Sequence, residues 1–128
     1  MILDSSAILA ILLREPGFET VVERIAGATH LSIGAPNLTE TAIVLENRMG
    51  TAGRDVLIHF IHEWRVGIIA FSESHWQEAA AAYRRFGKGR HKAALNFGDC
   101  MSFAVAKLSG RPLLCVGAEF EKTDLELV

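Results

Sequence analysis

The stretch Met1-Ile2-Leu3-Asp4-Ser5-Ser6-Ala7-Ile8 opens the chain with a short apolar run that ends on a carboxylate. The run predicts a strand over residues 1–4, and the residues after it predict a helix over 6–13. A carboxylate directly after a buried strand is costly unless another group pairs with it. Asp4 is therefore a candidate metal ligand, and its alternative role is to cap the helix that follows.

Apolar runs and amphipathic segments alternate along the rest of the chain, which is typical of βαβ units. The run 66–71 is almost continuously apolar, as expected for a central strand covered on both faces. Ser74 and Gln77 match a capping box for a helix over 75–86. The remaining segments predict strands over 30–33, 112–116 and 124–128, and helices over 18–26, 36–49, 56–64 and 99–109.

Length and composition favour one domain. The chain has 128 residues, of which 50% are hydrophobic and 22% charged, which suits a single α/β domain over residues 1–128. No apolar run reaches membrane-spanning length, and the N-terminus lacks the features of a secretion signal. We therefore expect a cytoplasmic protein without membrane contact. Cys100 and Cys115 fit no metal spacing, and Asp99 beside Cys100 argues against a reactive thiolate.

Three further acids have settings that resemble that of Asp4. Glu40 lies one turn into the helix that begins at Pro36, Asp99 opens another helix, and Glu119 follows an apolar run. Because the carboxyl ends of parallel strands form one ligand crevice, acids that lie at these ends form an anionic pocket. A hard divalent cation with oxygen ligands is the usual way to neutralise such a pocket. Alternatively, Glu40 is an exposed helical residue, Asp99 an N-cap and Glu119 a surface acid.

A basic stretch directly precedes the segment that carries Asp99. The net charge of −2 argues against a protein that coats nucleic acid by bulk attraction, but this stretch contains no acid. Basic side chains at the rim of an acidic pocket would hold the phosphates of a polyanion. The alternative is an ordinary solvated loop. The candidate RNA-binding residues are Arg84, Arg85, Lys88, Arg90 and Lys92.

The segments around the four acids resemble, in order, the motifs of a PIN domain. Their order, spacing and total length are similar to those of VapC-type toxins, the ribonuclease halves of bacterial toxin–antitoxin pairs. The resemblance implies an α/β fold with three α/β/α layers around a central, largely parallel sheet. The segments are residues 1–8, Pro36-Asn-Leu-Thr-Glu40, Leu95-Asn96-Phe97-Gly98-Asp99-Cys100 and residues 112–124, which include Gly117-Ala118-Glu119-Phe120.

The same resemblance implies a metal-dependent endoribonuclease. Its catalytic and metal-binding residues would be Asp4, Glu40, Asp99 and Glu119, around one or two Mg²⁺ or Mn²⁺ ions. Ser6 and Asn96 would support this site, and Asn96 either bonds Asp99 or a phosphate, or shapes its loop. The partners implied are an RNA substrate, a small VapB-like antitoxin and a second copy of the chain.

One departure from the PIN pattern affects the fourth acid. The last motif commonly has an acid or amide and then Asp before the Phe, whereas this chain has Ala118 and Glu119. Asp124 is a weak substitute for Glu119. Alternative functions are a PIN-like nuclease of RNA or DNA processing, or a PIN module without catalysis. A phospho-accepting receiver domain also gathers acids at strand ends, but the run 66–71 ends without an Asp.

Overall fold

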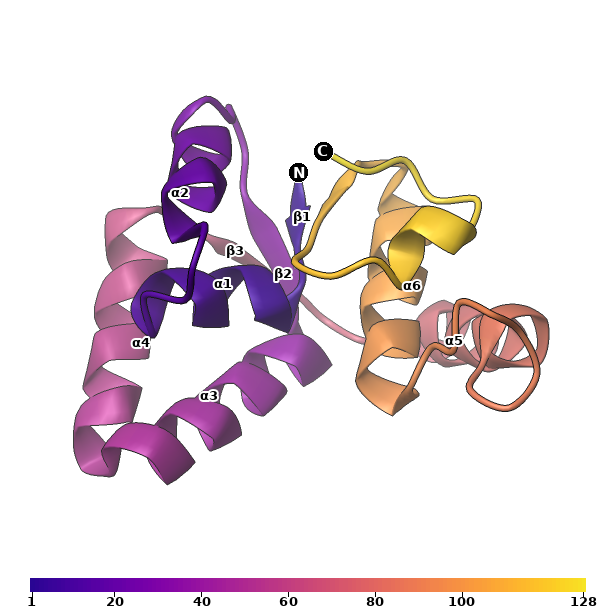
Figure 1. Cartoon of the computed structure of the whole chain (residues 1–128), viewed down its shortest axis with the longest axis horizontal. Coiled ribbons are helices and arrows are strands. Elements are labelled where there is room, and N and C mark those ends of the chain that lie inside the picture. Colours follow the sequence, from indigo (N-terminus) through magenta and orange to yellow (C-terminus); the bar gives the residue numbers. More distant parts are fainter.

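The computed structural model describes residues 1–128 as a four-stranded sheet with helices on both faces (Figure 1). None of its helices is both long and apolar enough to span a lipid bilayer. In chain order the elements are β1 (Ile2–Leu3), α1 (Ser5–Leu12), α2 (Phe18–Ala26), β2 (Ser32–Gly34), α3 (Ala35–Met49), α4 (Thr51–Glu63), β3 (Gly67–Ile69), α5 (Glu73–Phe86), α6 (Phe97–Ser109), β4 (Leu113–Leu114) and the 3₁₀ helix η1 (Phe120–Lys122).

The strands are all parallel and lie in the order β3-β2-β1-β4. The N-terminal strand β1 lies inside the sheet, where Ile2 pairs with Ser32 on one side and with Leu113 on the other. Because all strands run the same way, the segments that follow them emerge at one edge of the sheet. Asp4, directly after β1, therefore lies at the same edge as the start of α3 and the loop after β4.

The two faces of the sheet carry separate hydrophobic clusters. Successive strand residues point to opposite faces, so Ile2 packs with α5 and α6 whereas Leu3 packs with α1, α3 and α4. Leu113 belongs to the same cluster as Ile2, and Leu114 belongs to the same cluster as Leu3. Figure 1 shows α1 to α4 on one side of the sheet and α5 and α6 on the other. This arrangement confirms the predicted three-layer α/β/α architecture.

The prediction of a central, covered strand over 66–71 is wrong. β3 is an edge strand, and the Ile68 side chain is 56% exposed. An apolar run is equally compatible with a buried strand and with an open edge, so the pattern did not distinguish them. The argument against a receiver domain assumed that this run is the central strand, so that argument is also wrong. The strand inside the sheet that ends on an acid is β1, with Asp4.

Three smaller features also differ from the prediction. The capping box of α5 joins Ser72 and His75 rather than Ser74 and Gln77, because the helix begins at Glu73. The N-cap of α6 is Asn96, so Asp99 lies inside the first turn instead of capping it. The strand predicted over 124–128 is reduced to a single bridge beside β4.

Candidate active site at the carboxyl edge of the sheet

Asp4 is buried, and hydrogen bonds fix both of its carboxylate oxygens. Oδ2 accepts from the backbone N–H of Ser6 at 3.0 Å and from the Ser6 hydroxyl at 2.5 Å. Oδ1 accepts from the hydroxyl of Ser102 in α6 at 2.5 Å. The Ser6 hydroxyl also accepts from the backbone N–H of Val116 at 3.0 Å, which links the first turn of α1 to the loop after β4. Asp4 both caps α1 and contributes to the site, because its two carboxylate oxygens bind different partners.

Glu40 enters the site from the first turns of α3. Pro36 lies in the first turn of this helix, where its missing N–H costs nothing. One oxygen of the Glu40 carboxylate accepts a hydrogen bond from the Ser5 hydroxyl. The other oxygen lies against Gly98, so closely that a methyl group at Gly98 would overlap it. Glu40 therefore reaches the residue directly before Asp99.

Asp99 is held by a reciprocal capping box at the start of α6. Its backbone N–H donates to Asn96 Oδ1 at 2.9 Å, and its Oδ2 accepts from the Asn96 N–H at 2.9 Å. The pKa of Asp99 is raised to about 6, chiefly because its carboxyl group is buried, although the hydrogen bond from Asn96 lowers it. The charges of Asp4, Glu119 and Glu40 contribute smaller parts of this rise. The structure thus brings the four predicted acids together, and it uses Asn96 to orient Asp99.

Glu119 is the most exposed of the four acids. It follows β4 by a short loop and directly precedes η1. The loop turns at Gly117, whose φ of +111° strains any other residue, and the Glu119 carboxylate folds back against this glycine. Its charge raises the pKa of Asp99, so Glu119 contributes to the field of the acidic edge despite its exposure.

The chemistry of this donor set fits a hard divalent cation. All four side chains offer carboxylate oxygens, which Mg²⁺ and Mn²⁺ prefer. As the side chains stand, no three Asp, Glu, His or Cys residues are placed to hold a metal ion together. Serine hydroxyls occupy oxygens of Asp4 and Glu40 instead. The residues therefore fit such an ion in type and charge.

Asp124 does not belong to this group. Its carboxylate binds Arg85 at 3.1 Å and Lys107 at 3.0 Å. Burial acts to raise its pKa, but the hydrogen bonds from Lys107 and Arg85 prevail and hold the pKa below its ordinary value. Its charge is not among those that shift Asp99. Asp124 thus fastens the C-terminal segment to α5 and α6 and is no substitute for Glu119.

Cys100 is no nucleophile, as the sequence indicated. Its thiol is buried in α6, and burial raises its pKa to about 11, with a further contribution from the charge of Asp99. A thiol with this pKa carries almost no thiolate at neutral pH.

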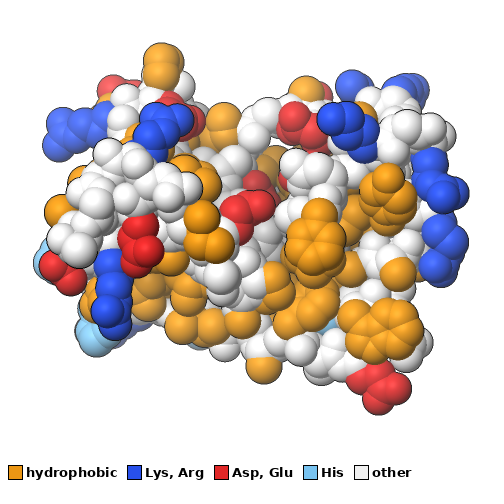
Figure 2. Space-filling model, turned by 90° about the horizontal axis from the view of Figure 1, so that it is seen from below, with side chains coloured by type: hydrophobic (Ala, Val, Ile, Leu, Met, Phe, Trp, Pro, Cys, Tyr) orange, Lys and Arg blue, Asp and Glu red, His pale blue; other side chains and the backbone are white.

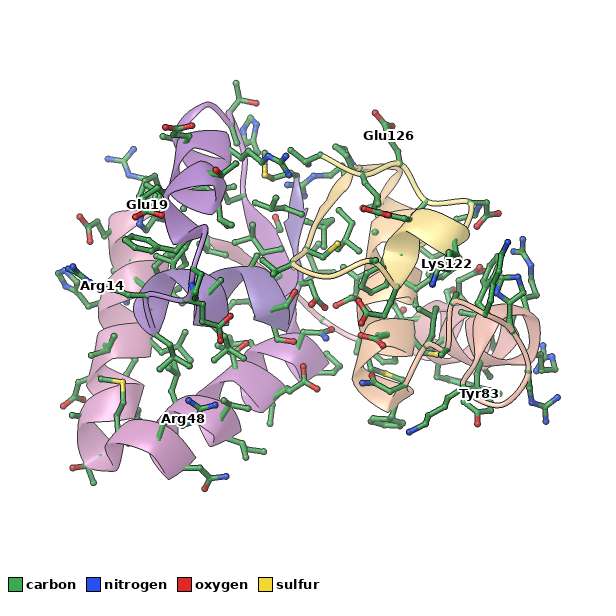
Figure 3. The ribbon with its side chains drawn as sticks, in the orientation of Figure 1. Arg14, Glu19, Arg48, Tyr83, Lys122 and Glu126 are labelled. Carbon is green, nitrogen blue, oxygen red and sulfur yellow. The ribbon has the colours of Figure 1, made fainter.

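The five predicted RNA-binding side chains are exposed on α5 and the segment after it. Arg85 is engaged with Asp124, and the Arg90 guanidinium lies over the Tyr83 ring at 5.6 Å. Figure 3 places Tyr83 and Lys122 on this side of the molecule, whereas Arg14 and Arg48 lie on the opposite half. Figure 2 shows basic side chains along the right edge and also on the left of this face, with carboxylates in a central hollow and apolar side chains around it. The exposed basic stretch over residues 84–92 is called the basic flank below.

Three supporting residues were missed by the sequence analysis. Ser102 and Ser5 bind the carboxylates of Asp4 and Glu40. Asn37 bonds the carbonyl oxygen of Gly98 across 61 positions of sequence. Only Ser102 had a usable signal, because it lies one helical turn after Asp99 and shares its face.

Comparisons with known proteins identify the family of the chain. The family model described as "PIN domain" matches residues 1–126. A protein described as "Ribonuclease VapC" from Mycolicibacterium smegmatis is 42% identical over 128 residues, which cover 100% of this chain and 99% of the relative.

Solved structures show the same fold. The crystal structure of Mycobacterium tuberculosis VapC20, described as a sarcin-ricin loop cleaving toxin, has a TM-score of 0.81 at 18% identity and covers 99% of this chain and 97% of that one. A toxin–antitoxin complex from Klebsiella pneumoniae has a TM-score of 0.72 at 14% identity, covering 99% and 95%. With the family model and the 42% identical ribonuclease, these findings show that the chain belongs to the PIN-domain family, among the VapC-type ribonucleases.

Proposed function

We propose that this chain is an endoribonuclease toxin that hydrolyses RNA at its acidic edge with the help of Mg²⁺ or Mn²⁺. The observation that carries the proposal is the convergence of four carboxylates from separate segments at one edge of the sheet, where the charges of three of them add to the burial that raises the pKa of Asp99. Four like charges at one edge destabilise the fold, and a divalent cation relieves this repulsion. Membership of the VapC-type ribonucleases supports RNA as the substrate.

The four acids would have different roles in this reaction. Asp4 and Asp99 are fixed by hydrogen bonds and would anchor the cation. When bound, the ion supplies a Lewis acid that activates water and offsets negative charge on the phosphorus centre. Glu40 and Glu119 would complete the cation site, and one of these two carboxylates would also orient the attacking water.

The test is to incubate the purified protein, freed of any partner, with total RNA and to map the cut ends. Water attacks phosphorus in line in this proposal, so cleavage should require Mg²⁺ or Mn²⁺ and leave 5′-phosphate and 3′-hydroxyl ends. Ends carrying 2′,3′-cyclic phosphate would mean that the RNA 2′-hydroxyl is the nucleophile, and the proposed chemistry would then be wrong.

The basic flank is proposed to bind phosphates of the RNA. A triple change of Lys88, Arg90 and Lys92 to Ala should weaken binding of single-stranded RNA. It should also reduce the log–log salt slope by up to about 2, because each lost contact contributes about 0.7. Titrations at several salt concentrations, with an uncleavable substrate, measure both. An unchanged affinity and slope would identify the stretch as a solvated loop.

Two protein partners complete the proposal. A small antitoxin would bind this chain and cover the acidic edge, as expected for a toxin whose fold matches a chain of a toxin–antitoxin complex. A second copy would pack on the apolar surface around Phe97, which is 79% exposed, and Trp76, which is 57% exposed. In sedimentation, the wild-type chain should run as a dimer and Phe97→Glu as a monomer. A monomeric wild type would contradict the dimer, and a dimeric Phe97→Glu would contradict this surface.

A further inference from the structure

Asn37 combines deep burial with an unpaired polar atom. Its side chain is 1% exposed, and its Oδ1 is the one buried side-chain nitrogen or oxygen without a hydrogen-bond partner. Buried polar atoms are normally paired, and an exception calls for an explanation such as a role at a functional site. Asn37 also lies in the first turn of α3, one turn before Glu40.

The orientation of the Asn37 amide is determined by its one partner. Nδ2 donates to the carbonyl oxygen of Gly98 at 3.1 Å. The reversed orientation would place Oδ1 against that carbonyl, so two acceptors would face each other. The donor end therefore points to α6, and the unpaired Oδ1 lies 3.7 Å from the position that a methyl group on Gly34 would take.

Gly98 is consequently held by α3 in two ways. The Asn37 amide binds its carbonyl oxygen, and the Glu40 carboxylate packs against its Cα. The next residue is Asp99, whose carboxylate is fixed at the start of α6 by the Asn96 N–H. The contact at Gly98 thus joins the two helices that carry Glu40 and Asp99.

We propose that Asn37 is a positioning residue that sets the separation of the Glu40 and Asp99 carboxylates through its bond to Gly98. It touches neither RNA nor the reacting atoms. The inference rests on the proposed function, because the spacing matters only if these two acids share a cation. A purely structural role would be served as well by an apolar side chain, which leaves no unpaired acceptor.

The test compares Asn37→Leu with Thr41→Val. Leu retains the approximate size of Asn37 without the amide. Thr41 is a matched control, because it is also fully buried on α3 and its hydroxyl donates to the Asn37 carbonyl oxygen at 2.7 Å, within one helix. Three quantities are measured for each variant: the melting temperature, the midpoint of a Mn²⁺ titration followed by thermal shift, and kcat and KM on RNA.

We expect Asn37→Leu to melt within a few degrees of the wild type. Its Mn²⁺ midpoint should rise about tenfold and its kcat fall about 10–100-fold, as for residues that orient metal-binding side chains. KM should stay within about twofold, because no RNA contact is lost. Thr41→Val should lower the melting temperature and leave the Mn²⁺ midpoint and kcat unchanged.

Gly98→Ala tests the same contact from the other side. The new methyl group overlaps only the end of the flexible Glu40 side chain, so the protein should fold with Glu40 displaced. It should reproduce the loss of Mn²⁺ affinity and kcat. If wild-type protein cleaves RNA and both Asn37→Leu and Gly98→Ala match Thr41→Val, the inference is overturned and the proposed function stands. If wild-type protein neither binds Mn²⁺ nor cleaves RNA, both the inference and the proposed function are wrong.

Discussion

Asp99→Asn is expected to lower RNA cleavage by about 10²–10³-fold while raising the melting temperature of the metal-free protein. The amide keeps the shape of the side chain and an oxygen for the Asn96 N–H, so the capping box survives. It removes one of four charges that would stabilise the cation and the transition state, a loss that costs about 10²–10³-fold for a single electrostatic contact. The same change removes repulsion from Asp4, Glu119 and Glu40.

Opposite effects on activity and stability identify a residue kept for function at a cost in stability. Asp55→Asn is the matched control, because Asp55 is an exposed acid on α4 and its loss should change neither quantity. Single-turnover cleavage and thermal melts in EDTA measure the two effects. Wild-type cleavage by Asp99→Asn would show that the four carboxylates are not the catalytic site.

Mn²⁺ or Mg²⁺ is expected to raise the melting temperature by roughly 10 °C near saturation at neutral pH. A ligand that binds only the folded state at about 100 times its Kd stabilises it by about 2.7 kcal/mol. For a chain of this length, each kcal/mol corresponds to roughly 4 °C. Matched ionic strength from NaCl should give a much smaller shift, and EDTA should reverse the effect. Equal shifts from both salts would exclude a specific site.

The pH dependence of this shift follows from Asp99. Its pKa rises from an ordinary value of 3.8 to about 6 in the folded protein. Protonated Asp99 therefore favours the folded state below about pH 4, and this contribution is lost as pH rises through 6. The metal-free protein should lose stability across that window. Protons compete with the cation there, so the metal-induced shift should be small at pH 5 and full at pH 7.5.

The sequence predicted those parts of the site that depend on local pattern. Asp4, Glu40 and Asp99 each lie near the start of a helix, and capping and first-turn signals mark such starts. The parallel sheet then required these starts to meet at one edge. α2 was predicted with its observed bounds because Phe18, Val21 and Ile25 repeat at helical spacing.

What the sequence could not predict depends on contacts between distant segments. The bond from Ser102 to Asp4 spans 98 positions, and no local pattern records it. The place of β3 at the sheet edge is likewise a property of strand order, which apolar content does not determine. The α5 capping box was misplaced because His75 takes the position where the pattern expects Glu or Gln.

The internal position of β1 has a consequence for how the protein is made. β1 precedes the other strands in the chain, yet one of its two neighbours is β4, which follows all of them. Asp4 obtains its bond to Ser102 only after α6 exists, and Glu119 emerges later still. Contacts of such long range form late and slow folding. A nascent chain on the ribosome therefore lacks the complete acidic edge until the segment after β4 has been synthesised.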